Sequence, residues 1–97
     1  MTPVAPTKDA TRADQAYLRE ATDRLRRDPD DLDALETAGA WLLAHDRADK
    51  ALECFHRITR LDPSYPGIWR LKARAFEALG DAESAALCRQ RGADRRS

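Results

Sequence analysis

The chain repeats itself with a period of 34 residues, and this period constrains its fold more than any other feature. Asp28-Pro29 recurs as Asp62-Pro63. Similar residues recur at the same distance in further pairs: Leu35 and Trp69, Gly39 and Ala73, Leu42 and Phe76, Ala51 and Ala85, and Cys54 and Cys88. A unit of this length cannot bury its apolar face alone, so the sequence predicts units that stack on one another.

Within one unit, small and apolar residues follow the spacing of two helices joined by a turn. The first unit has the following pattern: Leu35, Ala38, Gly39 and Leu42, then Ala51, Phe55 and Ile58. Small side chains let two helix backbones approach each other, and large side chains fill the space around the contact. With the Asp, Ser, Pro and Gly residues at the boundaries, Asp46 as a helix cap among them, the pattern predicts helices at about 11–27, 31–44, 47–61, 66–79 and 82–92.

This pattern resembles the tetratricopeptide repeat, which ends in A-x3-F and a closing proline. In residues 32–65 these places hold Ala51, Phe55 and Pro63. The second copy, residues 66–92, departs from the pattern at Arg89 and Gly92, where apolar residues of other sizes belong.

The resemblance implies an all-α fold, a right-handed α-α superhelix of helical hairpins with five helices in the domain 11–92. Residues 11–27 are similar to the second helix of an earlier copy and are expected to lead the stack. Residues 1–10, which contain Pro3 and Pro6, and residues 93–97 are expected to form tails.

Composition and charge exclude several classes of protein. Basic and acidic residues number 17 each, so the overall field favours neither nucleic acid nor an anionic membrane. Two cysteines are too few for the disulfide framework of a small secreted domain. No segment approaches the apolar length of a membrane-spanning helix. We therefore expect a cytoplasmic protein, and the high alanine and arginine content favours a bacterial source.

The ionisable residues form no recognisable catalytic or metal-binding motif. His45 and His56 lack a third ligand at a metal-binding spacing. Cys54 and His56 are two residues apart, on opposite sides of a helix, and cannot pair as nucleophile and base. A glycine-rich phosphate loop is also absent from the sequence. We expect no enzyme activity, no cofactor and no metal, and two free, partly buried thiols.

In the family that the pattern resembles, the first helix of each pair lines a concave groove that holds an extended peptide or a partner's helix. Carried over position by position, the resemblance implies these groove residues: Asp33, Glu36, Ala40, Leu43 and Ala44, then Gly67, Arg70, Arg74, Glu77 and Ala78. Residues 36, 40 and 43 stand at i, i+4 and i+7, as do 70, 74 and 77, so each set shares a helix face. Ala40, Leu43 and Ala44 would form an apolar floor beside two arginine forks for a carboxylate or phosphate.

The two groove helices differ in charge. Residues 30–46 contain acids and no Lys or Arg, whereas residues 64–79 contain Arg70, Lys72 and Arg74 against Glu77 alone. The two arginines either contact an acidic partner segment or form an ordinary solvated face. The carboxylate clamp of co-chaperone members is not expected, because Glu36 and Ala40 occupy its places on the first of these helices.

Trp41 lies off the stripe of Leu35 and Leu42, on a face shared with Ala34 and His45. It either packs against a flanking helix or serves as an exposed anchor for a partner, because tryptophan is enriched in interface hot spots.

The ends of the stack raise a question, because about three repeats are usually needed for stability and this chain has two and a half. The leading helix is expected to cover one end through a stripe of Ala13, Tyr17, Leu18, Ala21 and Leu25. At the other end, Arg89, Gln90 and Arg91 are typical of a capping helix that faces water. The alternative is that a partner or a second copy completes the stack.

The sequence therefore predicts a non-catalytic adaptor that binds a protein or peptide partner, of unknown identity, in the groove. One alternative is a self-associating structural protein, for example a homodimer, without a foreign ligand. A second alternative, a nucleic-acid accessory protein, is disfavoured because the arginines near both ends are interleaved with acids and lack aromatic stacking platforms.

Overall fold

Five α-helices joined by short turns form the part of the chain that the computed structural model describes, namely residues 8–94, with side chains described for residues 15–93. The helices are α1 (Lys8–Arg27), α2 (Leu32–Ala44), α3 (Ala48–Leu61), α4 (Ile68–Ala78) and α5 (Ala82–Asp94). No strand occurs within residues 8–94. The predicted all-α class with five helices is confirmed.

The outer helices are longer than the sequence pattern predicted. Helix α1 begins at Lys8, so the expectation that residues 8–10 belong to a tail is wrong. No Pro or Gly interrupts the chain between Pro6 and Arg27, and nothing in the sequence stops the helix from extending towards its N-terminus. Helix α5 runs to Asp94, beyond the expected end, because an internal glycine such as Gly92 costs a helix only about 1 kcal/mol. The remaining tail residues, 1–7 and 95–97, lie outside the described part.

Local hydrogen bonds explain where α2 and α3 begin. The Asp31 carboxylate accepts a hydrogen bond from the backbone N–H of Ala34, as expected of an N-cap, and also pairs with Arg24 of α1. The predicted cap Asp46 does not cap α3. It adopts a left-handed φ of 62° in the turn after α2, and the N-cap of α3 is Arg47, which makes no side-chain cap bond.

The connection before α4 contains two successive turns, at Pro63-Ser64 and at Pro66-Gly67. Gly67 has a φ of 77°, a conformation that glycine adopts without steric cost, and α4 therefore begins at Ile68 rather than at the expected residue 66. Gly80, with a φ of 82°, occupies the left-handed turn after α4, as predicted. Asp81 then accepts a hydrogen bond from the N–H of Ser84 in the first turn of α5.

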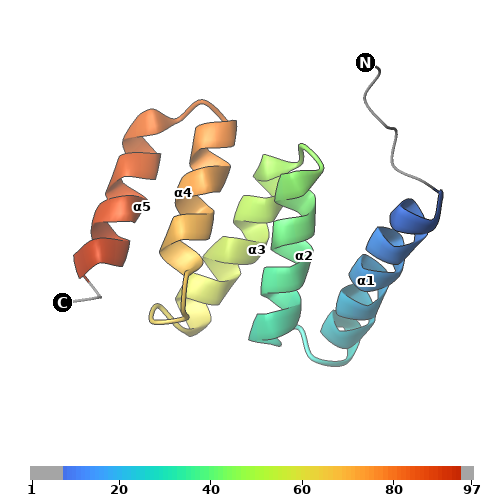
Figure 1. Ribbon diagram of the computed structural model, residues 1–97. Helices are drawn as coiled ribbons and strands as arrows, with labels where there is room; N and C mark the ends of the chain where they lie inside the picture. Colours follow the sequence, from blue (N-terminus) through green and yellow to red (C-terminus); the bar gives the residue numbers. More distant parts are fainter. Residues whose placement is uncertain (1–7, 95–97) are drawn as a thin grey trace, which may run out of the picture.

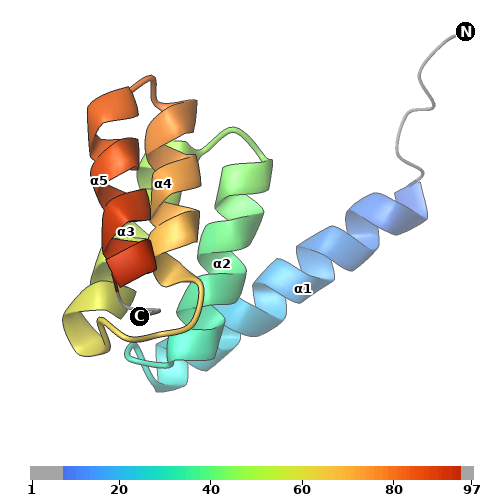
Figure 2. The same ribbon diagram turned by 60° about the vertical axis from the view of Figure 1, so that its left-hand side comes forward.

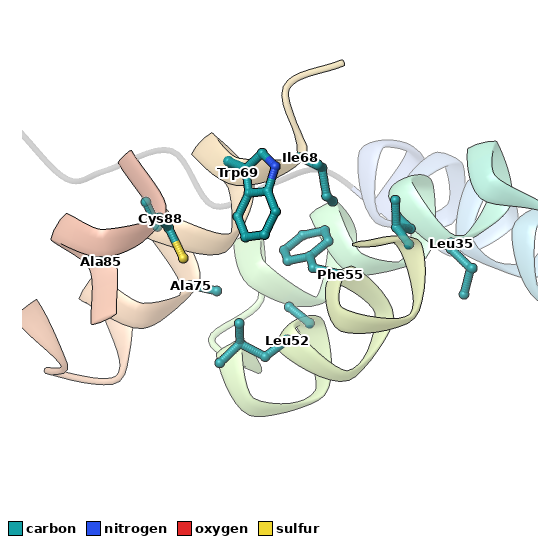
Figure 3. Packing of buried hydrophobic residues seen from close by; sticks show 11 residues of the cluster. Leu35, Leu52, Phe55, Ile68, Trp69, Ala75, Ala85 and Cys88 are labelled. Carbon is teal, nitrogen blue, oxygen red and sulfur yellow. The ribbon is translucent and has the colours of Figure 1, made fainter. Parts of the chain in front are cut away.

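The helices stack in chain order, from α1 at the right of Figure 1 to α5 at the left, with α2–α3 and α4–α5 as antiparallel hairpins. The main core spans both hairpins, and Figure 3 shows Trp69 of α4 drawn between Phe55 of α3 and Cys88 of α5. Ile68 of α4 is fully buried in this core with Phe55 and Ile58. Helix α4 is thus the element that covers the α2–α3 hairpin.

Within the first hairpin, α2 and α3 approach closely at Gly39. A Cβ atom added to Gly39 would lie 2.5 Å from Cε1 of Phe55, so the ring occupies the space that a side chain at this position would need. The pairing of a glycine with an aromatic ring in the repeat pattern therefore corresponds to a direct contact between the two helices.

Helix α1 packs less completely than predicted. Ala21 is buried against Ala34 and Ala38 of α2, with Leu18 and Leu25 partly buried beside them. Tyr17, placed in the same stripe from the sequence, is 64% exposed. The reason is visible in Figure 2, where α1 adjoins α2 at the turn and its N-terminal half points away from the hairpins. The expected Ala13 contact lies outside the described side chains. No helix between residues 8 and 94 combines the length and the apolar character needed to cross a bilayer.

Candidate functional site

Tyr65, in the loop between α3 and α4, connects that loop to the acidic start of α2. Its hydroxyl donates to Oδ1 of Asp33 at 2.6 Å and lies 2.5 Å from Oε2 of Glu36. Because one hydroxyl carries a single proton, the two carboxylates share this donor. Burial and these hydrogen bonds raise the pKa of Tyr65 well above its usual value of 10.0. Two predicted groove residues are thus brought together by a tyrosine for which the repeat pattern assigned no role.

A pocket of about 830 Å³ lies between α4, α5 and the loop, and Tyr65 is one of its lining residues. Four predicted groove residues line it: Gly67, Arg70, Arg74 and Glu77. Other residues on its wall are Tyr65, Trp69, Ala73, Arg89, Gly92 and Ala93. A volume of this size is within the range of sites that hold a small molecule or the side chains of a protein partner.

The pocket exists because the second hairpin lacks two side chains that fill the first. The residues 34 positions after Phe55 and Ile58 are Arg89 and Gly92. Phe55 and Ile58 are completely buried, whereas Arg89 is exposed and pairs with Glu77 of α4. Gly92 has no side chain and lies close to α4, because a Cβ atom built there would be only 3.3 Å from Cβ of Trp69. The pocket therefore stays open where Arg89, paired with Glu77, does not fill the place that Phe55 fills in the first hairpin.

The pocket is rich in positive charge. Arg70 and Arg74 are exposed, and among residues 15–93 neither takes part in an ion pair. Glu77 is engaged by Arg89. Lys72 lies between these arginines in the sequence, but its side chain is only 7% exposed. It therefore does not add to the positive charge at the surface of the pocket. Its burial lowers the pKa of the ammonium group.

Trp69 forms the inner wall of the pocket and is held by polar groups. Its indole N–H donates to the carbonyl oxygen of Pro63 at 3.0 Å. The Lys72 ammonium nitrogen lies 4.6 Å and the Arg91 guanidinium carbon 5.3 Å from the centre of its ring, within cation–π distance. Lys72 also lies 3.4 Å from the hydroxyl oxygen of Thr59 on α3. The indole therefore links α4 to the preceding loop and to α5.

The remaining predicted groove residues are more dispersed. Ala40 and Ala44 on α2 and Ala78 on α4 are exposed and do not line the 830 Å³ pocket. Leu43 is half-buried and packs against the main core, so only part of its side chain is available as a groove floor. A single continuous lining from α2 to α4 stays a prediction.

Trp41 is half-buried, and its ring stacks on His45 with centroids 3.8 Å apart. The backbone carbonyl of Trp41 lies 2.8 Å from Nδ1 of the same histidine. Its indole nitrogen is buried and has no hydrogen-bond partner among the described residues. A partner's acceptor cannot reach that nitrogen without a movement of the ring, and the role of an exposed anchor stays a prediction.

The potentially reactive side chains lie apart from the pocket mouth. Cys54 is half-buried, Cys88 is buried, and both thiols are free, as predicted. Burial raises the pKa of both thiols, so each is a weaker nucleophile at neutral pH than an exposed cysteine. His56 is partly buried near the ring of Phe76, and burial lowers its pKa, with a smaller effect from Lys72 and Arg60. Within the described residues, no group of three or more metal-ligating side chains comes together.

The repeat geometry agrees with a comparison of the sequence with known families. Residues 32–75 match the family model described as Tetratricopeptide repeat. The chain carries a tetratricopeptide repeat. The matched segment covers α2, α3 and most of α4, which confirms the family predicted from the 34-residue period. No significant match was found among curated proteins or among solved structures. The repeat is typical of protein–protein interaction modules.

The sequence did not predict that Arg89, Gly92 and Tyr65 belong to the candidate site, for two different reasons. Arg89 and Gly92 were noticed as departures from the repeat pattern, and those departures mark the open pocket. Tyr65 carried no signal, because its contacts depend on how the loop after Pro63 folds against α2.

The Tyr65 contacts lead to a stability prediction. Tyr65→Phe is expected to lower the free energy of unfolding by about 1 to 2 kcal/mol at pH 7, because two carboxylates lose a shared donor. Since the folded state raises the pKa of the phenol, the unfolded state of the parent protein loses its proton first as the pH rises above 10.0. The stabilisation due to Tyr65 should therefore decline above that pH.

Urea titrations followed by circular dichroism at pH 7 and at alkaline pH would test this prediction. The difference between the parent and Tyr65→Phe should be largest at pH 7 and smaller at alkaline pH. Tyr17→Phe is the matched control, because Tyr17 is 64% exposed and the substitution removes the same hydroxyl group from the surface. Equal stability of the parent and Tyr65→Phe at pH 7 would contradict the assigned hydrogen bonds.

Proposed function

We propose that this chain is an adaptor whose tetratricopeptide repeat binds a segment of a partner protein along α2, the Tyr65 loop and α4. The observation that carries the proposal is that Arg70 and Arg74 are exposed at a pocket in a protein-interaction repeat and form no ion pair with the side chains of residues 15–93. Two guanidinium groups on successive turns of one helix can form charge-assisted hydrogen bonds with carboxylates of a bound segment.

The contacts of the acidic side of the surface support the same proposal. Asp33 and Glu36 are held by Tyr65, and Tyr65 also lines the pocket that contains the two arginines. The surface thus has carboxylates at α2 and guanidinium groups at α4, and Tyr65 contacts the first and lines the pocket that contains the second. A partner segment with basic residues towards α2 and acidic residues towards α4 would complement this surface. The surface would then select the chain direction of the segment as well as its composition.

The chemistry of the side chains favours binding over catalysis. The thiols have raised pKa values, and His56 is partly buried beside an aromatic ring. No nucleophile in this region is paired with a base, and the proposal assigns the chain no catalytic role.

The arginines near the ends of the stack support a protein partner rather than nucleic acid. Arg24 pairs with Asp31, Arg26 with Asp23, and Arg89 with Glu77. An arginine already paired with a carboxylate contributes less to the release of counterions from a phosphate backbone.

Charge reversal at the two free arginines tests the function. The double variant Arg70→Glu with Arg74→Glu should keep the helical circular dichroism spectrum and reduce capture of the natural partner from source-cell extract by at least about tenfold. The matched control is Arg19→Glu with Arg47→Glu, which makes the same change in net charge at exposed residues outside the pocket. If both double variants capture the partner as the parent does, the proposed surface is wrong.

A further inference from the structure

The junction between the two hairpins shows how this chain covers the end of a hairpin. Phe55 and Ile58 of α3 are completely buried there, as is Ile68 of the covering helix α4. Two further contacts fix α4 and its loop in place: Tyr65 reaches the acids of α2, and Lys72 approaches Thr59 of α3. The junction thus depends on large buried side chains of the α2–α3 hairpin and on polar side chains of α4 and its loop that contact this hairpin.

The α4–α5 hairpin presents the same kind of surface without a covering helix among residues 8–94. Trp69 and Ala73 take the places of Leu35 and Gly39. On α5, Ala93 takes the place of Thr59, and it lines the pocket. Because Arg89 is paired with Glu77 and does not take the place of Phe55, a pocket lies between α4 and α5 where the first hairpin is filled.

The polarity of this second surface is reversed. In the first hairpin, Asp33 and Glu36 accept a hydrogen bond from the covering segment. The equivalent residues of the second hairpin are Gly67 and Arg70, and Arg74 replaces Ala40 one turn later. Where the first hairpin offers acceptors to a donor, the second offers the guanidinium donors of Arg70 and Arg74, and its one carboxylate in the pocket, Glu77, is paired with Arg89. A segment that covers α4–α5 must therefore supply acceptors, and carboxylates match guanidinium groups best.

We propose that the α4–α5 hairpin binds an acidic amphipathic helix of a partner protein, which covers this hairpin as α4 covers α2–α3. Its carboxylates pair with Arg70 and Arg74, and one large apolar side chain enters the pocket beside Trp69 and Gly92. This inference rests on the proposed function, because both use the two arginines. The inference differs from the proposed function in two respects. It places the partner on α5 as well as on α4, and it specifies that the partner segment is an acidic amphipathic helix.

A second copy of the chain is a poorer occupant than an acidic partner helix. The acidic start of α2 is the chain's best candidate for such a helix, but its carboxylates are engaged internally. Asp30 pairs with Arg57, Asp31 with Arg24, and Asp33 and Glu36 hold Tyr65. A partner helix with free carboxylates need break none of these contacts. One helix on one hairpin makes a small interface, so we expect micromolar affinity.

Two synthetic amphipathic peptides of about 18 residues provide the probes. Both carry the same leucine stripe at i, i+3, i+4 and i+7; one has Glu and the other Lys at the solvent-facing positions. In fluorescence anisotropy titrations, the parent should bind the Glu peptide at least about tenfold more tightly than the Lys peptide. Arg70→Glu with Arg74→Glu should reverse this preference, and added salt should weaken both complexes.

Bulky substitutions locate the peptide on the molecule. Ala93→Trp fills the pocket from an exposed position on α5 and should weaken binding of the Glu peptide at least about tenfold. Leu87→Trp is the matched control on the same helix. Its equivalent in the first hairpin, Glu53, stays exposed although α4 packs on α3, so this substitution should change the affinity less than about twofold. Circular dichroism verifies that each variant is folded.

A third variant separates this inference from the proposed function. If Ala40→Trp on α2 blocks the Glu peptide and Ala93→Trp does not, the peptide lies on the α2 side, and the inference is overturned while the groove proposal stands. Absence of Glu-peptide binding, or equal binding of the Lys peptide, also overturns it. So does light scattering that shows a dimer of the parent which Ala93→Trp dissociates, because the occupant would then be a second copy.

Discussion

Replacing Phe55 by alanine is expected to lower the free energy of unfolding by about 3 to 5 kcal/mol, a large part of the total of about 5 to 15 kcal/mol that is typical of a folded domain. The ring is completely buried and belongs to the core that spans both hairpins. It also fills the space above Gly39, where α2 offers no side chain that could move into a cavity. The loss should therefore include both the transfer of the ring to water and the cost of an unfilled hole.

Urea titration followed by circular dichroism would measure this effect. Tyr17→Ala is the matched control, since it also removes an aromatic ring but from a side chain that is 64% exposed, and it should cost less than about 0.5 kcal/mol. Similar losses for Phe55→Ala and Tyr17→Ala would show that the junction between the hairpins does not depend on the ring.

The fold could be predicted because the signals that define it are local and occur twice. Gly39 and Phe55 are 16 positions apart in the sequence and meet in the structure, as the spacing of a helical hairpin requires. The end of α4 followed from Gly80 for the same reason, since a left-handed residue after a helix is set by the backbone alone. The start of α4 was less predictable, because Pro66 is as compatible with the first helical turn as Gly67 is with the preceding turn.

The candidate site could be predicted only in part, because helical spacing places a residue on a face but does not say how much its side chain is covered. Arg70 and Arg74 were placed at an exposed surface and lie there. Lys72, two residues away, adds to the positive charge of the helix in the sequence, but it is buried beside Trp69. Leu43 was placed on a groove floor, but it packs partly into the core. These differences arise from contacts with α3 and α5, which a single helix pattern does not contain.

The pocket itself had a sequence signal that was interpreted differently. Arg89, with Gln90 and Arg91, predicts a polar capping helix, and Gly92 is a departure from the repeat pattern. Polarity at the end of a stack and absence of side-chain volume produce the same departure from an apolar pattern. The structure distinguishes them, because Arg89 pairs with Glu77 and both residues line the pocket beside α4.

The second large effect is expected at Trp69. Trp69→Ala should lower the free energy of unfolding by about 3 to 5 kcal/mol, because the indole belongs to the core that holds α3, α4 and α5 together. Trp69→Phe should cost only about 1 to 2 kcal/mol. It keeps most of the apolar volume and a ring for the Lys72 and Arg91 cations, but it loses the hydrogen bond to the carbonyl oxygen of Pro63.

A double variant tests whether the ring also stabilises the buried charge of Lys72. Without the indole, the ammonium group keeps only its contact near the Thr59 hydroxyl, 3.4 Å away, which leaves a poorly solvated cation in the core. Lys72→Met should then restore part of the stability lost in Trp69→Ala, giving a coupling energy of at least about 0.5 kcal/mol between the two sites in urea titrations. Strictly additive effects of the two substitutions would mean that the ring and the ammonium group stabilise the hairpin independently. A loss below about 1.5 kcal/mol for Trp69→Ala would instead show that α4 and α5 stay together without the indole.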